Sequence, residues 1–189
     1  MLYKNSKNTK NPRLNNKAQV WIETVIYTLI GITIITIIIS VATPQIEKIK
    51  DKSIVTNMFG VLTDLDAVIS EVTQAEGYIK NIPISIGKGS LEINSSGNFI
   101  KYTLENTRLE ASEPGEDIPP EANIKIKTER MGSKFKITLT REYNDLNITF
   151  NNQIISRTLH GGGAVHSLVI QNMGDNAINA PTHIDFTLL

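Results

Sequence analysis

The sequence predicts an α+β chain. A long N-terminal helix, first transmembrane and then amphipathic, is expected to kink near Pro44 and to pack on a C-terminal, sandwich-like antiparallel β-rich head. Three observations lead to this fold class. Residues 24–43 are twenty consecutive uncharged residues rich in isoleucine. After Pro44, apolar residues recur at helical spacing as far as Gly77. From about residue 80 the pattern changes to short alternating runs separated by turn residues, which is typical of strands.

Charge is distributed unevenly along the chain. Its 189 residues suffice for one modest domain with appendages, and the formal net charge is zero. Residues 1–18 contain five basic residues and no acid, whereas the remainder contains 14 basic and 19 acidic residues, a net charge of −5. An acidic head argues against nucleic-acid binding by charge. The absence of cysteine excludes disulfides and thiolate metal sites.

Residues 24–43 have the length and composition of a transmembrane helix. At a rise of about 1.5 Å per residue they span roughly 30 Å, the thickness of the hydrocarbon core of a bilayer. The hydroxyls of Thr28, Thr33, Thr36 and Ser40 are expected to bond to carbonyls of the preceding turn, which makes them tolerable in lipid.

The flanking charges predict the orientation of this helix. Its N-terminal side carries five cations and no acid, whereas the cations that follow it are diluted by Glu47 and Asp51. The positive-inside rule therefore places the N-terminus in the cytoplasm and residues beyond 45 outside the cell. A conventional signal peptide is the competing interpretation, because Ser40-Val41-Ala42 is a weak cleavage match. The apolar core of such a peptide would be shorter, at about 7–15 residues.

The residues before the apolar run form a motif. Lys17-Ala18-Gln19-Val20-Trp21-Ile22-Glu23 follows a basic leader and opens directly into the run. Taken alone, Glu23 beside Trp21 is expected to lie at headgroup level. The motif as a whole resembles the processing region of type IV pilin precursors, and it is most similar to the archaeal class III signal peptides.

This resemblance implies how the chain is processed. A prepilin peptidase would cut between Ala18 and Gln19, remove residues 1–18 as a basic leader peptide and keep residues 19–43 as the transmembrane and later filament-core helix. Glu23 would become the fifth mature residue, where the family places a glutamate implicated in subunit registration. Ala18 departs from the commoner glycine, and Glu23 favours a pilin over an archaellum subunit.

The resemblance also implies a function. The chain would be a structural subunit, as a major or minor pilin, of a type IV pilus-like filament that serves adhesion, motility or uptake. It would begin as a single-pass cell membrane protein and end in an extracellular filament. Its partners would be the prepilin peptidase, the pilus assembly platform with its ATPase, the membrane, and other copies or related pilins that pack through the N-terminal helix. No cofactor and no enzymatic activity are expected.

Residues 44–77 predict a second, amphipathic part of the helix. Pro44 is expected to stop or kink the helix, and Gly77 is a plausible end. One apolar stripe runs along this part at spacings of three and four. Its members are Val55, Met58, Leu62, Leu65, Ile69 and Val72. The stripe is expected to pack against the protein's own sheet; a coiled-coil seam or a partner-binding face is the alternative.

Residues 78–189 predict an extracellular β-rich head. Hairpins are expected around residues 95–98 and 131–133, and a polar, proline-containing loop over residues 106–121. The expected strands are residues 90–94, 99–104, 124–130, 134–141, 146–150, 154–159, 165–171 and 183–189. Short alternating strands of this number indicate a small antiparallel sandwich or wrapped sheet, and the apolar C-terminus is expected to dock as a strand.

The glycine and histidine motifs of the head do not point to catalysis. Residues 160–163, His-Gly-Gly-Gly, match the oxyanion segment of some esterases, but a Gly-x-Ser-x-Gly nucleophile elbow is absent. Adjacent glycines more simply predict a turn that needs positive φ. The three histidines, His160, His166 and His183, lack the spacing of a zinc motif, so no metal site is expected.

Two triplets fit the pattern of N-glycosylation acceptors. They begin at Asn94 and Asn147, and both lie on the side predicted to be outside the cell. Either asparagine is therefore a possible glycosylation site.

Two other classes of function stay open. An uncleaved single-pass membrane protein with an extracellular ligand- or partner-binding β domain would keep residues 1–18 and tolerate Glu23→Ala. A membrane-tethered hydrolase would require the histidines to converge with an acid in three dimensions.

Overall fold

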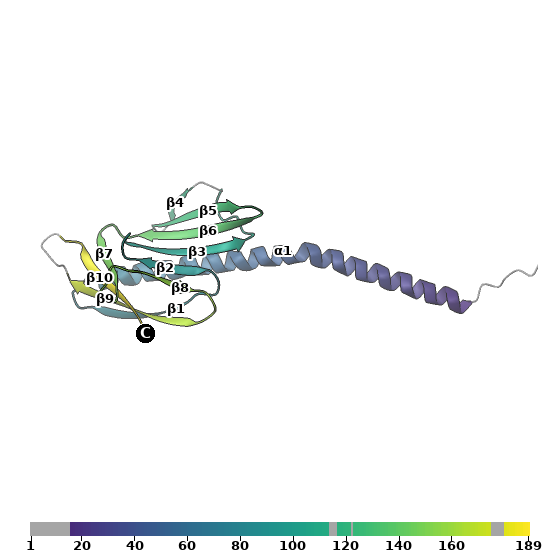
Figure 1. The fold of residues 1–189 in the computed structure, drawn as a ribbon, viewed down its shortest axis with the longest axis horizontal. Helices are drawn as coiled ribbons and strands as arrows, with labels where there is room; N and C mark the ends of the chain where they lie inside the picture. The colour runs from purple at the N-terminus through teal and green to yellow at the C-terminus, as the bar shows by residue number, and fades with distance from the viewer. Residues whose placement is uncertain (1–15, 114–116, 122, 175–179) are drawn as a thin grey trace, which may run out of the picture. The chain divides into compact units, whose positions relative to one another are not determined.

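The computed structural model describes residues 16–113, 117–121, 123–174 and 180–189. It confirms the predicted α+β class, because one long N-terminal helix precedes a β region of two sheets (Figure 1). The chain divides into two units, Met1–Pro44 and Gln45–Leu189.

One helix and ten strands make up the described part of the chain. The helix is α1 (Asn16–Val72). The strands are β1 (Ile79–Ser85), β2 (Ser90–Asn94), β3 (Phe99–Thr107), β4 (Asp117–Glu121), β5 (Ile124–Met131), β6 (Lys134–Glu142), β7 (Leu146–Phe150), β8 (Ser156–His160), β9 (Val165–Gly174) and β10 (Thr182–Leu188).

The predicted long helix is confirmed, because Pro44 lies inside α1 and does not stop it, whereas the C-terminal end of the helix differs from expectation. A proline in a helix interior removes one backbone hydrogen bond, and here the helix continues beyond that loss. The helix ends at Val72 and not at Gly77, because the following residues form turns. The side-chain amide of Asn172, on β9, donates to the Val72 carbonyl at 3.1 Å and so caps the helix from the sheet.

The predicted apolar stripe is the core-facing side of α1. All six of its members are buried, the most exposed being Val55 at 9%. They belong to one hydrophobic cluster with inward-facing residues of both sheets, such as Ile84, Tyr102 and Phe186. The stripe therefore packs against the protein's own sheets, as expected.

The strands form two sheets whose order the sequence did not predict. One sheet has the order β1-β9-β10-β7, and the other β4-β5-β6-β3-β2-β8. All pairings are antiparallel except that of β7 with β10, which is parallel. Figure 1 shows β5, β6 and β3 side by side in the larger sheet.

Two strands were missing from the prediction. β1 opens the head at a sheet edge, and β4 lies within the segment expected to be a polar loop. β4 contains Pro119 and Pro120, and it occupies the edge of its sheet, where a strand tolerates residues that donate no backbone hydrogen bond.

The predicted turns are confirmed. β2 and β3 form the first hairpin and β5 and β6 the second. In the turn after β8, Gly163 has a φ of 78°. A side chain on Gly161 would begin 2.8 Å from the backbone of Lys88, and the Gly161 amide donates to the Gly89 carbonyl at 2.7 Å. The glycine run is therefore the β8–β9 turn, and its Gly161 packs closely against the β1–β2 connection.

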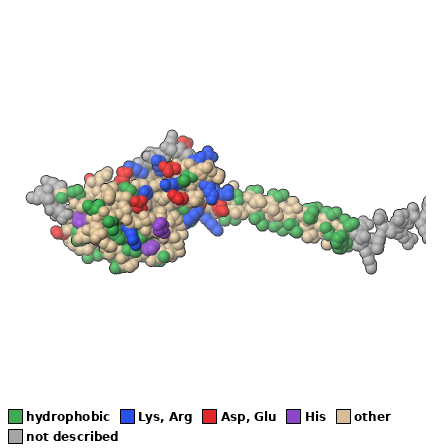
Figure 2. Space-filling view, in the orientation of Figure 1, with side chains coloured by type: hydrophobic (Ala, Val, Ile, Leu, Met, Phe, Trp, Pro, Cys, Tyr) green, Lys and Arg blue, Asp and Glu red, His purple; other side chains and the backbone are tan. Residues whose placement is uncertain are grey.

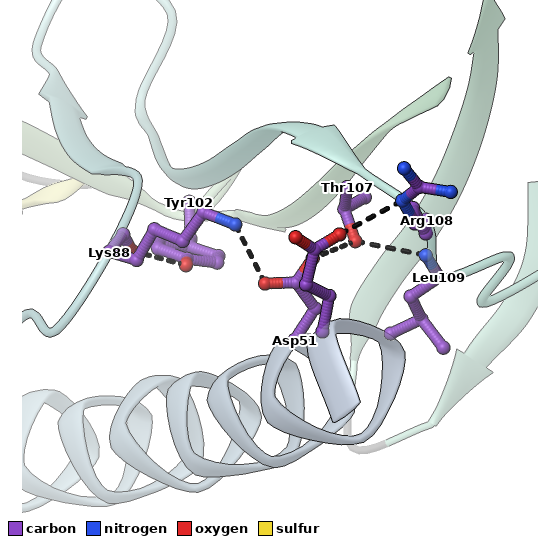
Figure 3. A network of polar contacts seen from close by, with 7 residues as sticks. Asp51, Lys88, Tyr102, Thr107, Arg108 and Leu109 are labelled. Carbon is purple, nitrogen blue, oxygen red and sulfur yellow. Dashed lines mark hydrogen bonds and ion pairs between the residues drawn. The ribbon is translucent and has the colours of Figure 1, made fainter. Parts of the chain in front are cut away.

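A buried carboxylate fastens α1 to the head (Figure 3). Asp51 is 5% exposed; one of its oxygens accepts from the Lys88 ammonium at 2.7 Å and the other from the Thr107 hydroxyl at 2.6 Å. Thr107 in turn accepts from the Leu109 amide at 3.0 Å. The Tyr102 hydroxyl donates to the Lys88 carbonyl, and burial, with a smaller effect of the Asp51 charge, raises the pKa of that phenol.

Candidate membrane-spanning and assembly segment

The N-terminal part of α1 is apolar and exposed on every side. An 18-residue window of it has a mean hydropathy of 2.5, and none of that window is buried. Its large apolar side chains are 45–71% exposed. They are Val20, Trp21, Ile22, Val25, Ile26, Tyr27, Leu29, Ile30, Ile32, Ile34, Ile35, Ile37, Ile38, Ile39 and Val41. By length and composition this is a candidate membrane-spanning helix.

The hydroxyl groups of this segment are satisfied within the helix. Thr28 donates to the Thr24 carbonyl at 2.8 Å and Thr33 to the Leu29 carbonyl at 2.7 Å. The hydroxyls of Thr24, Thr36, Ser40 and Thr43 make the same bond to the residue four positions earlier, at 2.8–2.9 Å. The expected back-bonding is thus confirmed, and it removes the desolvation penalty of these groups in lipid.

The residues predicted for processing and assembly lie at the start of this helix. Ala18 and Gln19 are in the first turn of α1, although their side chains are outside the described part of the chain. Residues 1–15 of the predicted leader also lie outside it. Glu23 follows Gln19 by four residues, about 6 Å of helix rise. Cleavage between Ala18 and Gln19 and the role of Glu23 stay predictions.

One histidine and one acid bond to the same threonine, but not in the arrangement of a nucleophile and its base. Thr149, His183 and Asp185 point from the adjacent strands β7 and β10 and are all buried. The Thr149 hydroxyl donates to Asp185 at 2.6 Å, and its oxygen lies 2.8 Å from Nε2 of His183. Since the hydroxyl proton is directed at Asp185, the imidazole must donate to Thr149. Such an imidazole cannot take the proton of that hydroxyl.

The sequence held a signal for this trio that the strand pattern alone did not reveal. Asn147 and Thr149 alternate on β7 as His183 and Asp185 do on β10. Only the parallel pairing of these strands brings the polar positions together, with Thr149 opposite Asp185. His160 lies on a different sheet and is exposed. Among the described residues, no three or more His, Cys, Asp or Glu side chains are grouped to hold a metal ion.

The two glycosylation triplets differ in accessibility. Asn94 begins the β2–β3 turn; its side chain donates to Glu92 at 2.9 Å and accepts from the Gly97 amide at 2.8 Å, and its triplet ends at the exposed Ser96. The triplet of Asn147 ends at Thr149, whose hydroxyl is buried and bonded. Glycosylation stays a prediction at both sites, and in the folded head the triplet of Asn94 is more accessible than that of Asn147.

A polar recess that sequence reasoning missed lies between α1 and the end of β6. It has a volume of about 260 Å³ and is lined in part by Asp66, Arg141 and Tyr143. Nε of Arg141 bonds to Asp66 at 2.7 Å, and the guanidinium lies 4.7 Å from the centre of the Tyr143 ring. Burial raises the pKa of Tyr143, and the Asp66 charge acts in the same direction. Asp66 and Arg141 are thus paired with each other, and Asp145 also lines the recess.

Comparison of the chain with protein-family models, with curated proteins and with solved structures gives no match.

Proposed function

We propose that this chain is the precursor of a pilin-like filament subunit, held in a membrane by the N-terminal part of α1. The observation that carries the proposal is the exposed apolar surface of residues 20–41, which follows a basic segment and a small residue and carries Glu23 at its edge. A helix that is apolar on all sides needs an apolar surrounding, which a bilayer or a bundle of like helices supplies.

The proposed mechanism uses the same helix twice. Cleavage after Ala18 gives Gln19 a cationic amine, and the helix then moves from the bilayer into a bundle of neighbouring subunits. In such a bundle an unpaired amine or carboxylate is costly. The stagger that brings the amine of one copy to Glu23 of the next satisfies both charges, so these two groups set the axial register.

The first test is the N-terminus of the native protein. Protein is recovered from membranes and from sheared surface material, and its intact mass and N-terminal sequence are determined. A chain that begins at Gln19 in both fractions is the expected result. A chain that begins at Met1 or after Ala42 contradicts the proposal.

The second test separates processing from assembly. Glu23→Ala and Glu23→Gln are expected to be cleaved normally but to give no filaments by electron microscopy, because neither variant can pair with the Gln19 amine. Glu105→Ala, which removes a carboxylate that is 59% exposed on β3, is the matched control and should assemble. Filaments at unchanged yield from Glu23→Gln would remove the charge-pairing mechanism.

The alternative is an uncleaved single-pass membrane protein whose head binds a ligand or partner. The recess beside Arg141 is the described feature that would serve such binding. This alternative predicts that residues 1–18 persist in the mature protein and that both Glu23 variants behave as the unaltered chain does.

A further inference from the structure

Basic residues gather at the end of the Gln45–Leu189 unit where the chain enters it, as the blue side chains in Figure 2 show. We call this set the basal cations: Lys48, Lys50, Lys52, Lys88, Arg108 and Lys134. The acids among them are Glu47 and Asp51. Residues 45–189 contain 14 basic and 18 acidic residues in all, so the rest of the unit carries eight against sixteen. The cations are thus segregated from the acidic remainder.

The two acids of this surface are already neutralised. Asp51 pairs with Lys88 at 2.7 Å, and Glu47 pairs with Nε of Arg108 at 2.9 Å. The other four basal cations, Lys48, Lys50, Lys52 and Lys134, form no ion pair within the described part of the chain. Their positive charge is therefore available to an anionic partner.

Three of the cations surround a recess. The recess has a volume of about 300 Å³ and is lined by Lys50, Lys88 and Lys134, by the two paired acids Glu47 and Asp51, and by Asn106 and Ile54. Since Asp51 and Glu47 are already paired, the ammonium groups of Lys50 and Lys134 and the side-chain amide of Asn106 suit an anionic group such as a phosphate diester.

The helix around these cations has the character of a membrane–water interface. Ile46 and Ile49, which flank Glu47 and Lys48, are 51% and 68% exposed. Lys48 and Lys52 follow Thr43, the last residue of the uncharged run, by at most about 8 and 14 Å of helix rise. The interfacial layer beyond the hydrocarbon core is about 5–8 Å thick on each side, and long lysine side chains extend toward it.

We propose that the basal cations bind the headgroups of anionic phospholipids at the surface from which the head emerges. This inference rests on the proposed membrane-spanning state of α1, and it adds a second, electrostatic attachment at the base of the head. Basic clusters next to a membrane span are attracted to anionic lipids in this way, and the attraction is screened by salt.

The test uses the full chain in vesicles. The chain has no cysteine, so Gly87→Cys gives a single label site. Gly87 is exposed, precedes Lys88, and has room for a side chain. Heads that face outward are labelled with a membrane-impermeant donor dye, and energy transfer to a headgroup-labelled acceptor lipid is measured. Vesicles of phosphatidylcholine are compared with vesicles that also contain phosphatidylglycerol.

The expected result is higher transfer in the anionic vesicles. The difference should vanish between about 0.01 M and about 1 M salt, where the Debye length falls from about 30 Å to about 3 Å. The variant K48Q/K50Q/K134Q should lose the difference at low salt. The matched control K125Q/K127Q/K136Q removes three lysines from the outer face of the larger sheet and should keep it.

Other outcomes overturn the proposal in distinguishable ways. Equal transfer in both vesicle types, from a chain that protease protection shows to span the bilayer, contradicts lipid binding alone. A chain that does not span removes the proposed membrane state as well. If energy transfer depends on the protein-to-lipid ratio and not on phosphatidylglycerol, the basal cations bind the acidic surface of a second copy and not lipid headgroups.

Discussion

The two parts of α1 contain similar apolar residues but arrange them differently around the helix. Before Pro44, isoleucine, valine and leucine cover the whole circumference of the helix and remain exposed. From Val55 to Val72, apolar residues form one stripe that is buried against the sheets, while the charged residues of this stretch lie off the stripe. The difference teaches that helical periodicity, and not hydrophobic content, decides whether a helix can complete a globular core. A helix that is apolar on all sides must find its apolar surrounding outside its own chain.

The largest effect expected from this contrast comes from a matched pair of truncations. Leu62→Ala removes a side chain that is 1% exposed and should destabilise the head by about 2–5 kcal/mol, because it leaves a cavity. Ile35→Ala, at a position 57% exposed, should change the unfolding free energy of the head by less than about 0.5 kcal/mol. Chemical unfolding of the full chain in detergent, followed by the near-ultraviolet circular dichroism of tyrosine, measures both. Equal losses would mean that the exposed part of α1 supports the head directly.

A smaller effect should come from the carboxylate that fastens α1 to the head. Lys88→Met leaves Asp51 buried with one hydroxyl partner, and should cost about 1–3 kcal/mol of unfolding free energy. Asp51→Asn keeps the shape, and lets the Lys88 ammonium, whose side chain is 45% exposed, return to water. It should therefore cost less than Lys88→Met in the same unfolding assay. The reverse order would show that the ammonium, and not the buried carboxylate, is the group that depends on its partner.

The last effect, which is absent near neutral pH, is a loss of stability in alkali. Burial raises the pKa of Tyr102 and Tyr143 in the folded head above the ordinary value of about 10. As the pH rises above about 10, the unfolded chain loses these protons first, so stability present below that pH declines. Each phenol contributes a slope of up to about 1.4 kcal/mol per pH unit.

Replacing both tyrosines by phenylalanine isolates that slope. Unfolding midpoints of Y102F/Y143F and of the unaltered chain are compared from pH 8 upward. The double variant should decline less steeply above pH 10, whatever its stability at pH 8. Parallel declines would attribute the alkaline loss to deprotonation of the lysines of the surface ion pairs.

Local patterns in the sequence were sufficient for much of the fold. The spacing of residues 55–72 identified the buried face of α1. Helix geometry predicted that Thr28 and the other hydroxyl residues of the apolar segment would donate to carbonyls one turn earlier. Turn chemistry at residues 95–98 and 131–133 gave both hairpins. The apolar C-terminal run is indeed docked as β10. These features depend on residues that are close together in sequence, so local sequence patterns are enough to predict them.

Features that depend on distant partners were not available from such patterns. The prolines of β4 predicted a loop, because the sequence does not show that this segment lies at a sheet edge. Nor does it show that Asn172, a hundred residues away, caps the helix end at Val72. Asp51 counted in the sequence only as an acid that dilutes the flanking cations, whereas in the fold it is buried against Lys88 and Thr107.

By itself, therefore, the sequence determined a membrane-compatible helix, an amphipathic continuation and a β-rich head, because each is written in local periodicity and charge. Only the tertiary structure decided the sheet order, the parallel pairing that joins Thr149, His183 and Asp185, and the gathering of three of the basal cations around one recess. Those features bring together residues from separate strands and loops. Which of many alternative pairings forms is fixed by the packing of the whole core, and not by any one segment.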